Sequence, residues 1–277
     1  MTLEQLAQNH SQSEVHQSYQ LWQGQTPLLI SVPHSGSIIP DQILAQMTPS
    51  AQGSIDSDWF MKELYYPIAQ SLGGSLISPI YSRYVIDLNR PESDQSLYPG
   101  QTTTGLCPQH RFDGQALYHH NNQPNLDEKN RRIHLYWRPY HQALQSELER
   151  LKSIHGSVLL WEGHSIKSVV PRFFDGQLPD LNIGTNQGQS CSQKIETHVA
   201  QYLKLQDQYT SVINGRFKGG YITRFYGSPD HNVHAVQLEL SQTTYLEVEQ
   251  TPKWSTDYAQ EISKVIKALI VSALSAL

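Results

Sequence analysis

Residues 159–165 read Leu-Leu-Trp-Glu-Gly-His-Ser, an apolar run followed closely by a histidine. The same arrangement occurs earlier, where the apolar stretch 27–32 is followed by His34 and Ser35. A strand that is apolar on both faces is typical of the interior of a covered sheet, and residues beyond its carboxyl end point into the crevice where α/β proteins bind ligands. His34 and His164 are therefore candidate metal ligands at two predicted strand ends.

Predicted helices and strands alternate around these two stretches. Helical spacing of apolar residues predicts helices over 58–71, 131–154 and 257–277, the second ended by Gly156 and kinked or restarted at Pro139. Strands are predicted over 27–32, 75–88 with a break at Tyr81 and Ser82, 157–161, and 233–240. This alternation predicts a single α/β domain over residues 1–277, with a mixed or mostly parallel sheet and helices on both faces.

Two stretches, 91–124 and 169–192, do not fit this alternation. Both are rich in Gly, Pro, Asn, Asp and Gln and are longer than ordinary connections. Long structured loops of this kind are often functional, so we expect them to contribute to a site.

The composition excludes several classes of partner. With 277 residues, 38% hydrophobic content and a formal net charge of -5, the chain can bury a full core but lacks the clustered basic residues that a nucleic acid requires. No run approaches the ~20 apolar residues that span a bilayer, and the amino terminus is polar, so we expect no membrane partner and a cytoplasmic location. The two cysteines, Cys107 and Cys191, are expected to be free thiols.

A third metal ligand is sought among nearby acidic residues, because a catalytic zinc takes about three protein ligands and one water. The candidates are Asp58, Asp56 and Glu162. Asp58 is preferred, although an aspartate at that position would also be explained as a helix N-cap. Glu162 would alternatively orient a histidine ligand from outside.

Glu239 lies in Val-Gln-Leu-Glu-Leu, an otherwise largely apolar strand. A charge there is costly unless it is paired or serves a purpose. Beside a metal-bound water, a glutamate would act as general base and then as proton donor to a leaving amine. The alternative is a buried ion pair.

Arginines lie among Gly and Tyr residues in loop-like segments, which indicates a pocket for carboxylates, because Arg pairs with a carboxylate through two parallel hydrogen bonds. Scattered surface positions are the alternative for any one of these residues. The cationic candidates are Arg83, Arg90, Arg172, Arg216, Lys218 and Arg224.

Seven segments, taken in order, resemble the N-formylglutamate amidohydrolase family. The resemblance runs from about Pro27 to Tyr245, and the segments are Val-Pro-His-Ser-Gly, Asp-Ser-Asp-Trp, Ser-Arg-Tyr-Val-Ile-Asp-Leu-Asn-Arg, Leu-Tyr-Pro-Gly-Gln, Gly-His-Ser-Ile-Lys-Ser, Leu-Asn-Ile-Gly-Thr-Asn and Asn-Gly-Arg-Phe-Lys-Gly-Gly-Tyr-Ile-Thr-Arg. That family is similar in fold to zinc carboxypeptidases and aspartoacylase, which implies a three-layer α/β/α sandwich around a mixed, mostly parallel sheet.

The resemblance also implies roles for individual residues. His34 and His164 correspond to the first and last zinc ligands of the carboxypeptidases, and Glu239 to their base. Asn89 and Arg90 correspond to a substrate-binding Asn-Arg pair. The carboxypeptidase pattern His-x-x-Glu is not kept, since the fourth residue here is Ser37, and the middle ligand is therefore inferred to be Asp58.

The implied reaction is hydrolysis of N-formyl-L-glutamate to formate and L-glutamate. Arg90 is expected to stabilise the developing oxyanion, Arg83, Arg216 and Arg224 to bind the two substrate carboxylates, and Tyr221 to close over the site. Zn²⁺ is the expected metal, with iron, cobalt or manganese as alternatives. Another N-acyl amino acid or a small acidic peptide is the alternative substrate, and a metal-binding or sugar-binding module is the non-enzymatic alternative. The oligomeric state is not indicated.

Overall fold

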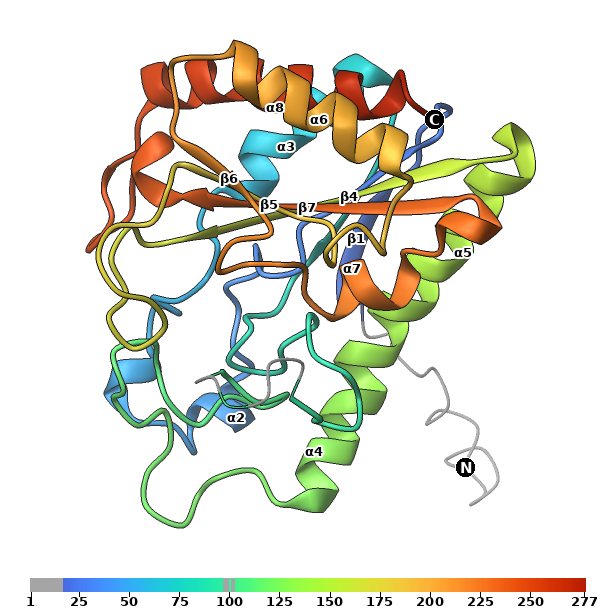
Figure 1. Ribbon diagram of the computed structural model, residues 1–277. Coiled ribbons are helices and arrows are strands. Elements are labelled where there is room, and N and C mark those ends of the chain that lie inside the picture. The colour runs from blue at the N-terminus through green and yellow to red at the C-terminus, as the bar shows by residue number, and fades with distance from the viewer. Residues whose placement is uncertain (1–16, 97–99, 101–102) are drawn as a thin grey trace, which may run out of the picture.

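The computed structural model describes residues 17–96, 100 and 103–277, and a seven-stranded sheet forms its centre (Figure 1). The strand order is β1-β3-β2-β4-β7-β5-β6. Four of the six neighbouring pairs are parallel, and β1 with β3 and β5 with β7 are antiparallel. The strands of this sheet are β1 (Tyr19–Trp22), β2 (Leu28–Ser31), β3 (Ser75–Pro79), β4 (Val158–Ile166), β5 (Leu181–Gly184), β6 (Ser211–Ile213) and β7 (Val233–Ser241). The prediction of a mixed, mostly parallel sheet is confirmed.

Helices cover both faces of the sheet, so the fold is the predicted three-layer α/β/α sandwich. In Figure 1, α3 (Met61–Leu72), α6 (Gln193–Leu205) and α8 (Thr256–Leu274) lie above the sheet, and α5 (Arg138–His155) and α7 (Tyr221–Tyr226) lie below it. Two large apolar clusters fill these layers, one against each face. Every residue of β2 and β4 is buried, which explains the apolar runs 28–30 and 158–161 within them.

The long helix predicted over 131–154 is built from three segments. The helix α4 (Leu126–Arg132) passes into a π-helical segment, Ile133–Trp137, and then into α5. Pro139 lies in the first turn of α5. A proline lacks the N–H of the helical ladder and collides with the carbonyl four residues earlier, so the wider π turn lets the helix continue past it.

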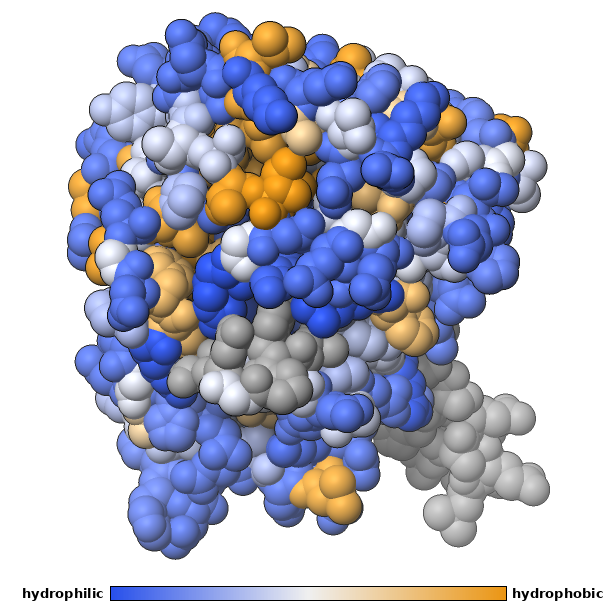
Figure 2. Space-filling model, viewed as in Figure 1, coloured by the Kyte–Doolittle hydropathy of each residue, from blue (hydrophilic) through white to orange (hydrophobic). Residues whose placement is uncertain are grey.

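The remaining short elements lie at the edges of this architecture. They are α2 (Asp41–Leu44), the 3₁₀ turns Pro49–Ala51, Pro229–His231 and Gln242–Thr244, and a two-stranded sheet of β8 (Leu246–Val248) and β9 (Lys253–Trp254). Within the described part of the chain, no helix is long and apolar enough to cross a membrane. The face shown in Figure 2 is mostly hydrophilic, and its apolar side chains form small separate groups.

Several predicted boundaries are wrong. The strand predicted over 157–161 continues through Ile166, so His164 lies inside β4 rather than beyond it. The strand predicted over 75–88 ends at Pro79, and the rest is a buried irregular segment whose apolar side chains pack into one of the clusters. The predicted loop 169–192 contains β5. The motif at 97–101 lies outside the described residues, except for Gly100.

Candidate metal centre and pocket

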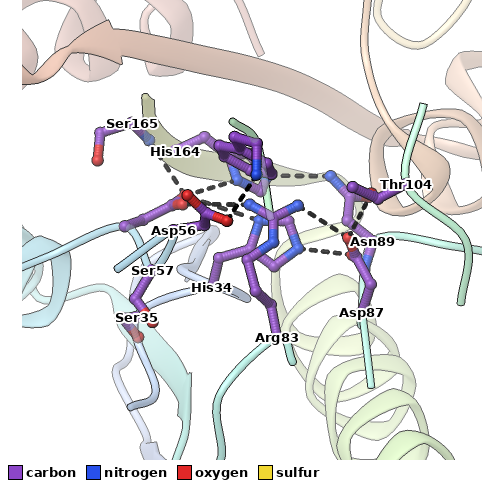
Figure 3. A network of polar contacts seen from close by, with 12 residues as sticks. His34, Ser35, Asp56, Ser57, Arg83, Asp87, Asn89, Thr104, His164 and Ser165 are labelled. Carbon is purple, nitrogen blue, oxygen red and sulfur yellow. Dashed lines mark hydrogen bonds and ion pairs between the residues drawn. The ribbon is translucent and has the colours of Figure 1, made fainter. Parts of the chain in front are cut away.

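Three neighbouring parallel strands bring the candidate residues together at one end of the sheet. His34 lies three residues past the end of β2, and β4 carries His164. His164 is directly opposite Glu239 of β7 in the strand register, so both side chains point to the same face of the sheet. Figure 3 shows His34 and His164 close together, and their ring centroids are 4.8 Å apart.

Asp58 completes a group of three side chains that can bind a metal ion. Its Oδ2 atom is 3.0 Å from Nδ1 of His164 and 3.7 Å from Nδ1 of His34. One ligand atom from each of the three residues lies within 4.8 Å of the others, and all three residues are buried. The helix-cap alternative for Asp58 is wrong, because α3 begins at Met61 and has no side-chain cap. The Asp58 carboxylate instead accepts a hydrogen bond from the backbone N–H of Ser165.

Each histidine ring is also bonded, on its far side, to one further carboxylate. Asp87 Oδ1 is 2.7 Å from Nε2 of His34, and Glu162 Oε1 is 2.7 Å from Nε2 of His164. This arrangement leaves Nδ1 of both rings facing Asp58, and carboxylates bonded to the distal nitrogen typically fix the orientation of metal-binding histidines. Thr223 donates a hydrogen bond to the other oxygen of Glu162. The centre thus has the outer support that metal sites require.

Asp56 and Glu162, the other candidates for the third ligand, lie outside the group of three. Asp56 accepts hydrogen bonds from the Tyr84 hydroxyl, at 2.6 Å, and from the backbone N–H of Phe112, at 2.9 Å. It therefore fixes the wall of the neighbouring pocket. No role was predicted for Asp87 from the sequence. Its place two residues before the Asn-Arg pair was the signal available there.

Charge at the centre favours a cation. Burial alone would raise the pKa of Asp58, but hydrogen bonds to His164 and His34 lower it below its ordinary value. Burial lowers the pKa of His164, but Glu162 and Asp58 outweigh this effect and hold it well above the usual range. Burial raises the pKa of Glu239 to about 8. Asp58 Oδ1 has no hydrogen-bond partner among the described residues and forms an ion pair with Arg83 at 3.5 Å, while Oδ2 faces the two histidines.

The centre opens into a pocket that His34 and His164 help to line. Glu239 lines it together with apolar and cationic side chains. The aromatic wall consists of Phe112, Phe173 and Phe217, and the arginines that line the pocket are Arg83, Arg90 and Arg216. This lining suits a small anionic molecule that presents a reacting bond to Glu239 and the metal group.

The arginines of the pocket differ in their contacts. Arg83 is buried, donates to Asp87 at 2.8 Å and lies over the ring of Phe112. Arg90 donates to the hydroxyl of Thr104 at 3.3 Å, and Arg216 donates to the carbonyl of Phe173 at 2.7 Å.

Two residues that the resemblance placed at the substrate do not line the pocket, namely Arg224 and Tyr221. Arg224 donates to the carbonyl of Gly219 at 2.8 Å. The ring of Tyr221 stacks on Phe225 at 5.0 Å. Both residues belong to α7.

Asn89 and Gln237 connect the pocket to α7. The side-chain carbonyl of Asn89 accepts from the N–H of Ile222 at 2.8 Å, and its amide nitrogen is 3.0 Å from Nε2 of His164. The side-chain carbonyl of Gln237 accepts from the N–H of Gly220 at 2.7 Å, and its amide is 3.4 Å from Glu239. The sequence analysis missed Gln237, although its position two residues before Glu239 on one strand places both on the same face.

Comparison with known proteins assigns the chain to a family. Residues 26–246 match the family model described as N-formylglutamate amidohydrolase. The chain is 44% identical over 252 residues to N-formylglutamate deformylase of Pseudomonas aeruginosa, and 44% identical over 253 residues to the protein of the same name from Pseudomonas putida. Each alignment covers 91% of this chain and 94% of the relative.

A solved structure shows the same fold. The crystal structure of N-formylglutamate amidohydrolase from Ralstonia eutropha JMP134 matches with a TM-score of 0.76 at 23% identity, and the match covers 92% of this chain and 97% of the other. The chain thus belongs to the N-formylglutamate amidohydrolase family.

Proposed function

We propose that this chain, acting as a single domain, hydrolyses N-formyl-L-glutamate to formate and L-glutamate. The observation that carries the proposal is the buried group of His34, Asp58 and His164 beside Glu239, in a pocket lined by arginines. The relatives named N-formylglutamate deformylase, at 44% identity over nearly their whole length, support the choice of substrate.

The three ligands suit a divalent transition metal, and zinc is the metal we propose. Two imidazole nitrogens and one carboxylate oxygen are a common catalytic zinc set, which leaves one position open. Iron, cobalt and manganese accept the same donors, so availability also decides which metal is bound. When bound, the metal would polarise the formyl carbonyl and lower the pKa of a water molecule.

Glu239 is the proposed general base and acid. It takes a proton from the attacking water as the new C–O bond forms at the formyl carbon. It then delivers that proton to the amide nitrogen as the C–N bond breaks, so that formate and the free amine of glutamate are released. Burial raises the pKa of Glu239 to about 8, and a divalent cation nearby would favour its charged form, which is the form that accepts the proton.

The arginines of the pocket are assigned to stabilising the oxyanion, binding a substrate carboxylate and supporting the metal centre. We assign Arg90 to the developing oxyanion and Arg216 to a substrate carboxylate. Arg83 is assigned to the support of the metal centre, because it pairs with Asp58 and Asp87. Arg224 is assigned to the support of the loop before α7 rather than to substrate.

Replacing Arg216 by alanine is expected to raise KM for N-formyl-L-glutamate about 10- to 100-fold, with a smaller change in kcat. The reason is that a hydrogen bond to a charged group contributes about 1.5–3 kcal/mol, and this contact is present in both the bound and the transition state. Steady-state kinetics on the variant measure both constants. Arg131→Ala, in α4 and outside the pocket lining, is the matched control and should change neither constant, whereas an unchanged KM for Arg216→Ala would remove this residue from substrate binding.

Metal binding is expected to release about one or more protons per ion near pH 7. The raised pKa values of His164 and Glu239 mean that both groups hold protons in the metal-free protein, and a metal requires the neutral imidazole. Metal affinity should therefore fall as the pH is lowered. Calorimetric titrations in two buffers of different ionisation enthalpy measure the released protons. Glu239→Gln should release fewer, and binding without proton release would contradict the assignment of His164 as a ligand.

The proposed function is tested by comparing the hydrolysis of three compounds: N-formyl-L-glutamate, N-acetyl-L-glutamate, and N-formyl-L-leucine. The proposal expects the first to have the highest kcat/KM by at least about tenfold, because the leucine compound leaves a charged pocket residue unpaired. The acetyl compound is followed by amine release and tests the acyl group. Higher kcat/KM with either of the other two would overturn the substrate assignment and leave the reaction class in place.

A further inference from the structure

Two side chains of the long helix, Trp137 and His141, form hydrogen bonds with the backbone next to the metal centre. Nε1 of Trp137 donates to the carbonyl of Arg90 at 2.9 Å, and Nε2 of His141 is 2.9 Å from the carbonyl of Leu88. The two side chains are one helical turn apart, and their rings stack with centroids 3.8 Å apart and an interplanar angle of 28°. Both donors thus reach alternate carbonyls of one short segment.

The Leu88 carbonyl determines which nitrogen of the His141 ring carries the hydrogen. A carbonyl only accepts hydrogen bonds, so Nε2 of His141 carries the hydrogen. Burial lowers the pKa of His141 to about 3, and the ring is therefore neutral. Its Nδ1 then lies 2.9 Å from the Tyr226 hydroxyl, which also donates to the backbone carbonyl of His141 at 3.2 Å and so connects the helix to α7. The histidine is held in the one tautomer that can bind the Leu88 carbonyl.

Residues 87–90, whose carbonyls accept these hydrogen bonds, include three side chains of the site. Residues 87–90 lie outside regular helices and strands, so their position depends on individual contacts of this kind. Asp87 is bonded to His34, and Asn89 lies beside His164 (Figure 3). Arg90 lines the pocket. A shift of this backbone would move all three side chains at once, and shifts of about 1 Å are enough to reduce catalysis strongly.

The π-helical segment explains why both rings point at the segment. It comprises Ile133–Trp137, so it ends at the first of the two residues. A π turn adds a residue to the helical circuit and changes which side chains face a neighbouring element, and such turns are frequent at functional sites. Here it ends at Trp137, the residue that donates to the carbonyl of Arg90.

We propose that Trp137 and His141 are positioning residues that hold Asp87, Asn89 and Arg90 in their working geometry through the carbonyls of Leu88 and Arg90. This inference rests on the proposed function for its kinetic consequences. Its consequence for metal binding follows from the contacts of Asp87 and Asn89 with the two histidines.

The test uses Trp137→Phe and His141→Phe, which keep an aromatic ring and remove the donor. Each is expected to weaken Zn²⁺ binding and to lower kcat, both by about tenfold, with a smaller change in KM. His141→Gln keeps a donor near the position of Nε2 and should recover most of kcat. Trp22→Phe, on the edge strand β1, is the matched control and should match the unsubstituted protein in all three quantities.

The outcomes separate this inference from the proposed function. A Trp137→Phe variant with unchanged Zn²⁺ affinity and unchanged kcat would overturn the inference. If His141→Phe fails to fold, Trp137→Phe and His141→Gln still decide it. If the unsubstituted protein releases no formate from N-formyl-L-glutamate, the proposed function fails. The Zn²⁺ affinity of Trp137→Phe alone then decides whether Trp137 and His141 position the residues of the metal centre.

Discussion

Replacing Glu239 by glutamine is expected to lower kcat for N-formyl-L-glutamate by about 10²- to 10⁴-fold, the range for loss of a general acid–base group. Glutamine has nearly the same shape and fits the same position in β7, but its amide cannot accept a proton from water. Metal content and KM should change little, because Glu239 is outside the group of three metal-binding side chains. Single-turnover formate release measures the chemical step directly.

The control for this prediction is Glu247→Gln, the same change at an exposed position of β8. It should leave kcat unchanged. A Glu239→Gln variant that keeps full activity would assign the proton transfer to another group. It would also favour the alternative in which this carboxylate is only part of a buried ion pair.

Replacing Asp58 by alanine is expected to lower metal affinity by at least about 100-fold and to abolish formate release. The Asp58 carboxylate faces Nδ1 of both histidines, so its removal leaves two neutral ligands and no anion between them. Loss of groups that only support metal ligands typically costs 10- to 100-fold, and loss of a ligand should cost more. Calorimetry and elemental analysis of the purified variant give affinity and stoichiometry.

Asp56→Asn is the comparison that identifies the third ligand. Asp56 is buried and accepts hydrogen bonds from Tyr84 and Phe112, so the variant should be less stable to heat. It should still bind one metal ion per chain. If Asp56→Asn loses the metal and Asp58→Ala keeps it, the assignment of the two aspartates is reversed.

The sequence was most informative where strands are buried on both faces. The runs at 27–32 and 157–161 are almost continuously apolar, and 233–240 is apolar apart from His234, Gln237 and Glu239; the three runs correspond to β2, β4 and β7 at the centre of the sheet. The strand β5 was missed because it is four residues long and lies in a region rich in turn-forming residues. A short strand of this kind is stabilised by its neighbour β7 rather than by its own pattern.

The site was predictable only in part for a similar reason. The strand ends located His34 and His164, but Asp58, Asp56 and Glu162 stayed open as the third ligand because the choice depends on the path of the chain after β2. The backbone N–H of Asp58 donates to the carbonyl of His34, a contact that no local sequence pattern predicts. Trp137 and His141 were also invisible, since a helical pattern does not reveal a π turn.

The most direct test of this account is to titrate metal-free protein with Zn²⁺ and to follow formate release from N-formyl-L-glutamate. Release should be absent without metal and should rise linearly to a plateau at one equivalent per chain. Asp58→Ala should show no release at the same concentrations. Full release by protein that elemental analysis shows to be free of metal would contradict the account, because the chemistry would then not depend on the group of His34, Asp58 and His164.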